Sequence, residues 1–316
     1  MTELIVRGIK LDVDYAEELQ EYMEQFGRYK IRDNKIQSCS PFRYEMHPSF
    51  AVNLDNGTWV DSGAETEEER KGNFTSLLSF LRQESYSETC EYLLDKYASI
   101  YDDVDNLKLS FNLSIDVEPR LIEDWAQYNY GECDYLTGRK ISKEIQEYFG
   151  TGMSIRGDVV VLPWHDRTGK VINIKYRKII DKTFFYSKGG KPVKQYLYGA
   201  FAVRNIGATT IAITESEIDA LYLWTLGIPA VAVGGASLSE QQQQELLLLG
   251  IETLIIATDM DTVGERFAEV LALELGGYMD VKRMILPTGK KDVNECNASE
   301  IYESYQNMKQ ILQNCF

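Results

Sequence analysis

The carboxyl-terminal part of the sequence predicts an α/β fold, with a parallel sheet flanked by helices. From Thr209 the chain alternates short apolar runs, such as TTIAIT, AVAVGG and TLIIATD, with amphipathic segments of helical period. Apolar strands that alternate with helices are typical of a parallel sheet covered on both faces. We expect this domain to span residues 208–316 and to end in a C-terminal helix.

The residues before this domain predict smaller mixed units. Residues 1–100 combine a capped helix over residues 14–27 with short strand-like runs and two amphipathic helices, which predicts a small α+β module. The polar, acidic residues 101–118 predict a linker. Residues 119–207 begin with two helices, the second capped by Ser142, and continue with strand-like runs. This pattern predicts a second small mixed subdomain.

Length and composition indicate the number of domains and the cellular compartment that we expect for the protein. The chain has 316 residues, enough for two or three domains, and 44% of them are hydrophobic. The sequence contains no apolar run of the length that spans a membrane, and MTELIVRGIKLDVDY does not resemble a secretory signal. Its five cysteines form no CxxC pair. We therefore expect a reduced, cytoplasmic protein without a membrane partner.

Charge is distributed unevenly along the chain. The net charge is −16, which by itself argues against nucleic-acid binding. Between Arg167 and Lys194, however, nine Lys or Arg accompany the single acid Asp181, a local balance of +8 that leaves −24 for the other residues. This pattern indicates one basic surface on an acidic body. Two interpretations remain open: a surface that binds a polyanion, or a solvated hairpin.

Acidic residues stand where the predicted strands of the parallel sheet end. Glu215 follows one strand, Asp219 lies one turn into the next helix, Asp259 and Asp261 end another strand, and Asp292 follows the last strand. In sheets of this kind, functional groups collect at the carboxyl ends of the strands. The sequence therefore predicts up to five carboxylates at one sheet edge.

Carboxylates that lie close together repel each other unless a cation neutralises them. A set of hard oxygen ligands without His or Cys suits Mg²⁺ or Mn²⁺, which serve phosphoryl and nucleotidyl transfer. The alternative is that each acid merely caps a helix or lies in a loop. For Asp219 alone the cap or loop interpretation is at least as good as the functional one, whereas the strand-end positions of Glu215, Asp259 and Asp261 favour a metal site.

Four ordered motifs in this region resemble the TOPRIM domain of DNA primases. They are ITESEIDAL, AVAVGGASLS, IIATDMDTVGERFA and ILPTGKKDVNEC. The resemblance is closest to the primase half of bacteriophage primase–helicases. It implies that Glu215 acts as general base or acid, that Asp259 and Asp261 hold metal, and that Asp219 and Asp292 complete the acidic set. It also implies that the glycines of the second motif form a close turn near the site, namely Gly234 and Gly235.

The resemblance continues upstream of the TOPRIM motifs. LTGRKISKEIQEYFG resembles the segment that opens the primase catalytic core, and the strands after it would form the basic subdomain that guides template and nucleotide phosphates. This implies a set of nucleic-acid- or nucleotide-binding residues: Arg139, Lys175, Arg177, Lys178, Lys191 and Lys194. Aromatic residues on these strands could stack bases or form the sheet core: Tyr176, Phe184, Phe185, Tyr186 and Tyr196.

The N-terminal module resembles the zinc-binding domain that precedes primase cores, but its metal ligands are mostly missing. CSPFRYEMHPSFAV keeps the pattern of the module, with Cys39 at a ligand position. Arg43 stands near the usual His position, and Asp61 and Ser62 stand where later cysteines belong. Cys39 with His47 could not complete a tetrahedral zinc site. We therefore expect no zinc and a module held together by its apolar core.

The resemblance implies a stand-alone DNA primase. Such an enzyme is a DNA-directed RNA polymerase that makes short primers on single-stranded DNA from ribonucleoside triphosphates. No GxxxxGK[ST] motif occurs, which implies a separate replicative helicase as partner. The phage-like motifs suggest a virus or mobile element in a bacterial host. Two alternatives remain: a TOPRIM nuclease or topoisomerase-like strand cutter, and a non-catalytic factor that binds single-stranded DNA or a helicase.

Overall fold

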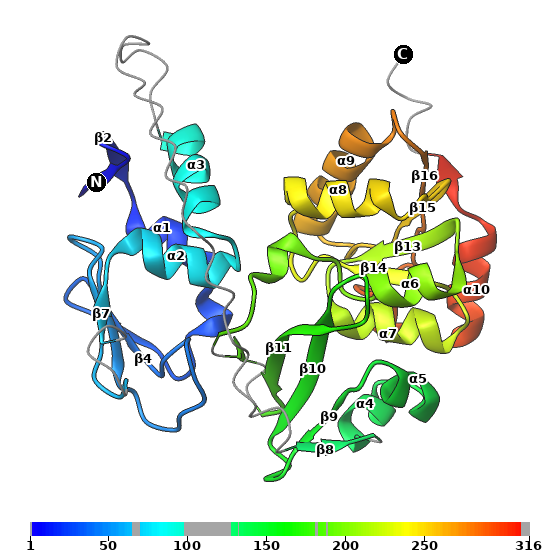
Figure 1. The fold of residues 1–316 in the computed structure, drawn as a ribbon, viewed down its shortest axis with the longest axis horizontal. Helices are drawn as coiled ribbons and strands as arrows, with labels where there is room; N and C mark the ends of the chain where they lie inside the picture. Colours follow the sequence, from blue (N-terminus) through cyan, green and yellow to red (C-terminus); the bar gives the residue numbers. More distant parts are fainter. Residues whose placement is uncertain are drawn as a thin grey trace. The chain divides into compact units, whose positions relative to one another are not determined.

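The computed structural model of the protein consists of two compact units (Figure 1). The first unit comprises Met1–Ile122 and Ile180–Pro192, and the second comprises Glu123–Ile179 and Val193–Phe316. The expected linker lies outside the described residues, and the expected boundary near residue 208 stays a prediction. The structure describes residues 2–64, 70–97, 128–131, 133–180, 183–187 and 189–310. Within these ranges, no helix has the length and apolar character needed to cross a bilayer.

The first unit is built on a five-stranded antiparallel sheet with the order β3-β4-β5-β6-β7. A two-stranded hairpin of β1 and β2 precedes this sheet, and short helices pack with both. The strands are β1 (Thr2–Val6), β2 (Ile9–Val13), β3 (Lys30–Arg32), β4 (Lys35–Ser38), β5 (Phe50–Asn53), β6 (Trp59–Asp61), β7 (Lys71–Gly72) and β12 (Phe184–Tyr186). The helices are α1 (Tyr15–Gln20), the 3-10 turn η1 (Met23–Gln25), α2 (Phe74–Arg82) and α3 (Tyr86–Tyr97).

Helix α2 shows how the sequence pattern builds the core of the first unit. Phe74, Leu77 and Leu78 recur at helical spacing, and all three are buried in one apolar cluster with residues of the sheet. The Asn73 side chain caps the helix by accepting a 2.8 Å hydrogen bond from the Ser76 backbone N–H. The first unit therefore combines helices and strands around one apolar core.

An ionic cluster of Ser40, Arg43, Glu45 and Asp61, here called the clasp, joins the loop between β4 and β5 to the end of β6. The guanidinium of Arg43 donates to both carboxylate oxygens of Asp61, at 2.5 and 2.7 Å, and to Glu45 at 2.8 Å. Ser40 donates to Asp61 at 2.6 Å, and Asp61 is only 1% exposed. A Cβ at Gly63 would lie 2.1 Å from Nη2 of Arg43, so a larger residue at this position would displace the guanidinium. The clasp occupies the segments where the family resemblance would place zinc ligands.

We expect Arg43→Leu to destabilise the first unit by about 2–3 kcal/mol, because it leaves the buried Asp61 without its charged partner. Burial alone would raise the pKa of Asp61, but hydrogen bonds from Arg43 and Ser40 outweigh it, and the pKa lies below its usual value. The difference between wild type and variant should therefore be present at neutral pH and shrink as the pH falls through that lowered pKa. Urea unfolding of the two proteins, followed by hydrogen exchange over residues 36–61, measures this difference in the free energy of unfolding.

The exposed ion pair between Arg7 and Glu91, 3.0 Å long, provides a matched control. Its side chains are 44% and 62% exposed, so Arg7→Leu should cost at most about 1 kcal/mol. Equal losses for the two arginine variants would contradict a special contribution of the clasp.

The second unit begins with an antiparallel sheet in which β8, β9, β10 and β11 lie in chain order. Its longest strands, β10 and β11, form a hairpin. Ser142 caps α5 through a hydrogen bond from the Ile145 N–H, as expected from the sequence. The elements are β8 (Tyr128–Tyr130), α4 (Asp134–Gly138), α5 (Lys143–Tyr148), β9 (Gly152–Ser154), β10 (Val159–His165), β11 (Val171–Lys178), the 3-10 turn η5 (Val193–Gln195) and α6 (Ala200–Ile206).

The predicted parallel sheet follows in the same unit, with the strand order β14-β13-β15-β16-β17. Strands β14, β13, β15 and β16 are parallel, and β17 adds an antiparallel edge. The elements are β13 (Thr210–Thr214), α7 (Glu217–Thr225), β14 (Ala230–Ala232), α8 (Glu240–Leu248), β15 (Thr253–Ile256), α9 (Thr262–Leu275), β16 (Asp280–Arg283), the 3-10 turn η6 (Val293–Glu295), α10 (Ala298–Gln306) and β17 (Lys309–Gln310).

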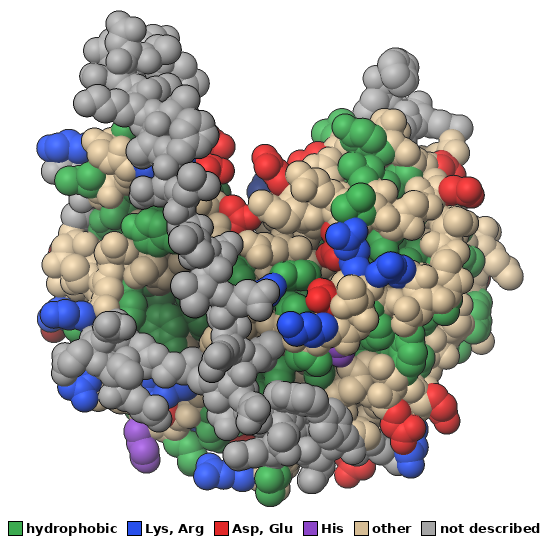
Figure 2. Space-filling view, in the orientation of Figure 1, with side chains coloured by type: hydrophobic (Ala, Val, Ile, Leu, Met, Phe, Trp, Pro, Cys, Tyr) green, Lys and Arg blue, Asp and Glu red, His purple; other side chains and the backbone are tan. Residues whose placement is uncertain are grey.

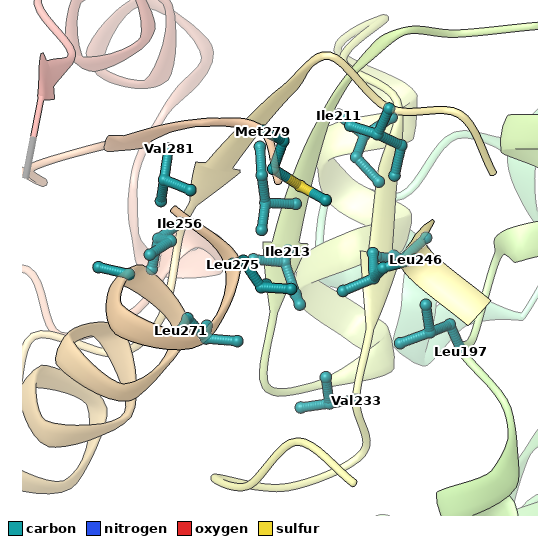
Figure 3. Packing of buried hydrophobic residues seen from close by; sticks show 14 of the residues in the cluster. Leu197, Ile211, Ile213, Val233, Leu246, Ile256, Leu271, Leu275, Met279 and Val281 are labelled. Carbon is teal, nitrogen blue, oxygen red and sulfur yellow. The ribbon is translucent and has the colours of Figure 1, made fainter. Parts of the chain in front are cut away.

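Both faces of this sheet are buried, which confirms the predicted fold class. Successive strand side chains point to opposite faces, yet Ile211, Ala212 and Ile213 are all fully buried. On one face, Leu246 of α8 and Leu271 of α9 pack against strand residues, as Figure 3 shows. Helix α7 packs against β13 and β14. The rigid sheet thereby presents its carboxyl edge to the residues that follow each strand.

Candidate active site

Two acids meet at the carboxyl ends of β13 and β15. Glu215 directly follows β13, and Asp259 lies shortly after β15. The two strands are parallel neighbours, with Ile213 opposite Ile256, so their carboxyl ends share one edge. The backbone N–H of Asp259 donates a 3.1 Å hydrogen bond to Oε1 of Glu215. The Glu215 carboxylate therefore points toward the aspartate segment.

A glycine in the first turn of α9 allows this close approach. A Cβ at Gly264 would lie 2.1 Å from the carbonyl oxygen of Asp259 and 2.9 Å from Oε1 of Glu215. Any other side chain would push the helix away from both acids. Gly264 thus determines how tightly the end of β15 packs against Glu215.

Asp219 links α7 to the turn that carries Asp292. It is 6% exposed, and Ser216 donates a 2.5 Å hydrogen bond to its Oδ2. The backbone N–H of Asn294 donates to its Oδ1 at 3.1 Å. Asp292 begins this turn and accepts a 2.8 Å hydrogen bond from the Glu295 N–H. The segment after β16 is thereby tied to the segment after β13.

Asp261 lies at the more exposed side of the acidic group. It caps α9 by accepting hydrogen bonds from the N–H groups of Val263 and Gly264, at 3.1 and 3.0 Å. Its other oxygen lies 3.2 Å from Nζ of Lys291. Asp261 and Asp292 therefore both act as caps, and this structural role leaves carboxylate oxygens for a further ligand.

Burial and mutual repulsion change the protonation of three of these acids. Burial, reinforced by the charge of Asp259, raises the pKa of Glu215 to about 7. Burial also raises the pKa of Asp219 to about 7 and that of Asp259 to about 6, and the charge of Asp292 contributes to both shifts. The pKa of Asp261 is instead lowered, chiefly by the N–H of Gly264. The edge therefore cannot hold all its negative charges at neutral pH without a cation.

The donor set fits a hard divalent ion. All five acids offer carboxylate oxygens, which suit Mg²⁺ or Mn²⁺, and the raised pKa values show a negative field that such an ion would relieve. Across the described residues, no three His, Cys, Asp or Glu side chains lie close enough to hold a metal by themselves. Mg²⁺ is commonly held by one or two carboxylates together with water and substrate phosphates.

Lys175, one of the predicted binding residues, lies inside the second unit. Its side chain is 7% exposed, and its Nζ lies 3.0 Å from Oε2 of Glu217. Trp164 donates a 3.0 Å hydrogen bond to the other oxygen of Glu217. Any contact of Lys175 with a phosphate would require it to leave a buried ion pair, which is costly.

Lys194 lies beside the glycine turn that follows β14. Its Nζ donates to the carbonyl and hydroxyl oxygens of Ser237, at 2.6 and 2.8 Å. Gly234, with a φ of +75°, forms the expected close turn, and the N–H of Gly235 donates to the Glu215 carbonyl oxygen at 3.1 Å. The turn therefore brings Lys194 into the neighbourhood of Glu215.

The other predicted basic residues have different surroundings. Arg139 exchanges hydrogen bonds with Asn294, at 3.2 and 2.6 Å, and so contacts the turn after Asp292. Arg177 and Lys178 are half-buried on β11, and Lys191 belongs to the first unit. On the face of the second unit shown in Figure 2, basic side chains stand among acidic and hydrophobic ones rather than forming one continuous basic surface.

Sequence reasoning missed three residues that organise the site. Arg283 lies buried beneath the Asp259 segment, Lys291 pairs with Asp261, and Asn294 joins Arg139 to Asp219. The signals were weak but present. Arg283 directly precedes the apolar run MILP, and two lysines and an asparagine flank the last acid.

Comparison with known proteins assigns the family. The Toprim-like family matches residues 212–297. The Gene 57 protein of Mycobacterium phage D29 is 34% identical over 140 residues, which cover 44% of this chain and 85% of that protein. A DNA primase of Clostridium acetobutylicum is 25% identical over 348 residues, which cover 91% of this chain and 56% of that primase. The chain belongs to the TOPRIM primase family. It spans little more than half the length of the Clostridium primase.

Solved primase structures are also similar to this member of the family. The zinc-binding and RNA polymerase domains of the Aquifex aeolicus primase match 95% of this chain and 84% of theirs, with 19% identity and a TM-score of 0.49. The primase fragment of the bacteriophage T7 primase-helicase protein matches 57% of this chain and 78% of its own, with 27% identity and a TM-score of 0.46.

Metal-free Glu215→Gln should be more stable than wild type at pH 8, by about 1–2 kcal/mol. The folded-state pKa of Glu215 lies above its usual value, so the wild type loses stability as the pH rises from about 4.5 to about 7. Glutamine removes that cost and still accepts the Asp259 N–H. Urea unfolding at pH 5 and pH 8 in EDTA measures the difference.

Asp261→Ala serves as the contrasting variant. Its pKa is lowered, and the change removes a helix cap, so it should destabilise the protein by about 1 kcal/mol at pH 8. A Glu215→Gln variant that is less stable than wild type at pH 8 would show that the acids are not crowded.

Proposed function

We propose that this chain is a DNA primase that makes short RNA primers on single-stranded DNA by metal-dependent nucleotidyl transfer. The observation that carries the proposal is the meeting of Glu215 with the Asp259 segment at a sheet edge that also holds Asp219 and Asp292. An acidic edge of this kind suits chemistry on phosphates, which needs divalent ions. The sequence family supports the same reaction.

The proposed roles follow from these positions. Glu215 acts as general base or acid, because a pKa of about 7 lets it exchange a proton near neutral pH. Asp259 and Asp261 hold Mg²⁺ or Mn²⁺, with Asp219 and Asp292 completing the acidic set. The bound ion supplies charge stabilisation at the phosphate under attack. Asp219 and Asn294 keep the two acidic segments together through their 3.1 Å hydrogen bond.

The substrates and partners belong to the same proposal. Single-stranded DNA and ribonucleoside triphosphates would bind through basic residues near the acids. These include Arg139, which contacts the turn after Asp292, and Lys194, which contacts Ser237 in the turn beside Glu215. Arg177, Lys178 and Lys191 would extend this binding, and zinc would not take part. A separate helicase and the cytoplasm of a phage-infected bacterium are the proposed setting.

Primer synthesis on mixed single-stranded templates, with the four ribonucleotides and Mg²⁺ or Mn²⁺, tests the function. Glu215→Gln should lower the rate by about 10²–10⁴-fold, the usual contribution of a general acid or base, without weakening DNA binding. Glu240→Gln, an exposed glutamate on α8, is the matched control and should keep full activity. Cleavage of the template by wild type would favour a nuclease, and DNA binding without either reaction would favour a non-catalytic factor.

Lys178 is a better probe of substrate binding than Lys175, because changing the buried Lys175 would also break its pair with Glu217. We expect Lys178→Gln to weaken binding of single-stranded DNA and to reduce the slope of log affinity against log salt by about 0.7, the effect of one lost phosphate contact. Fluorescence anisotropy at several salt concentrations measures both quantities. An unchanged slope would remove Lys178 from the binding surface.

A further inference from the structure

Arg283 is a buried charge directly beneath the acidic segment. It is the last residue of β16 and pairs in register with Ile256, the last residue of β15. The residue is only 4% exposed. Its guanidinium therefore lies where the chain leaves β15 and turns toward Asp259 and Asp261.

The guanidinium joins both ends of the segment from Thr258 to Glu265. Its Nη1 donates to the hydroxyl of Thr258, and its Nη2 donates to Glu265 at 2.9 Å. Nη2 also lies 3.5 Å from the carbonyl oxygen of Asp259. The Thr258 hydroxyl in turn donates to the carbonyl oxygen of Gly264 at 2.8 Å. One side chain thus links the end of β15 to the first turn of α9.

These contacts suit positioning better than stabilisation. Removing a guanidinium from water costs free energy, and its one ion-pair partner among the described residues, Glu265, is 51% exposed. The buried Nε of Arg283 has no hydrogen-bond partner in the part of the chain that the structure describes. A well-packed apolar side chain could hold β16 equally well, but it could not bind a hydroxyl, a carbonyl and a carboxylate together.

We infer that Arg283 is a positioning residue for the acidic site. It holds the Thr258–Glu265 segment so that the Asp259 N–H meets Glu215 and Asp261 begins α9. Its contacts are with the hydroxyl and carbonyl groups of this segment and with Glu265, so it acts on the acids through the backbone. The inference rests on the proposed function where Mn²⁺ binding and catalytic rates are measured, whereas amide exchange tests it independently.

Arg283→Met tests the inference, because methionine fills much of the same space without any donor. We expect the variant to fold, to exchange the amide hydrogens of residues 257–265 at least tenfold faster, and to bind Mn²⁺ at least tenfold more weakly in calorimetry. In primer synthesis, kcat should fall at least tenfold while KM for nucleotides changes little. Arg283→Lys should recover part of each loss, because its ammonium can reach only some of the acceptors.

Lys282→Met is the matched control. It removes a positive charge from the neighbouring position of β16, whose side chain pairs with Asp280 at 3.1 Å on the other face of the strand. This variant should behave as wild type in every measurement. If Arg283→Met fails to fold, Thr258→Val, which removes the hydroxyl link alone, gives the same comparison with a smaller change.

The outcomes separate the inference from the proposed function. Wild-type exchange and Mn²⁺ affinity in both Arg283→Met and Thr258→Val would overturn the positioning role, even if primer synthesis succeeds. Faster exchange in these variants, with a wild type that makes no primers, would support the positioning role and contradict the primase function.

Discussion

The second unit depends on one constraint, the crowding of carboxylates at the carboxyl edge of a parallel sheet. The parallel pairing of β13 with β15 brings Glu215 to Asp259, and the Asn294 N–H brings the Asp292 turn to Asp219. Burial then raises the pKa values of three acids to about 6 or 7. Close packing at Gly264 prevents the acids from separating. The fold therefore holds carboxylates close together despite their repulsion, whereas in an unfolded chain they would move apart.

The two units bury carboxylates in opposite ways. In the first unit, Asp61 receives two hydrogen bonds from Arg43, and its pKa falls below the usual value. In the second, Glu215 receives one backbone hydrogen bond, and its pKa rises. A guanidinium that pairs with a buried carboxylate stabilises its ionised form and already neutralises its charge, so such a carboxylate binds a further cation only weakly. A buried acid without such a partner has a raised pKa, which a bound cation would lower, and this is why we propose the functional site in the second unit.

The sequence could predict this edge because strand ends can be read from local patterns. The apolar runs before Glu215 and Asp259 are β13 and β15, and Ser142 caps α5 as expected. Long-range partners could not be predicted. The sequence pattern suggested a solvent-exposed basic cluster, but Lys175 is buried against Glu217. The helix expected over residues 14–27 ends at Gln20, and the side-chain amide of Gln25 donates instead to the carbonyl oxygen of Leu81. Such contacts depend on residues far away in the chain.

The cations that lie close to the acids do not neutralise Glu215, Asp219 or Asp259. Arg283 is buried beneath the segment, but its guanidinium contacts Thr258, the Asp259 carbonyl and Glu265. Lys291 pairs with Asp261 and lowers the pKa of Asp259 in part, yet that pKa remains raised to about 6. The pKa values of Glu215 and Asp219 are raised to about 7. Arg283 thus holds the Thr258–Glu265 segment in place, and Lys291 pairs with the exposed Asp261. At neutral pH Glu215, Asp219 and Asp259 are therefore only partly ionised, and a divalent ion bound at the edge would favour their ionised forms.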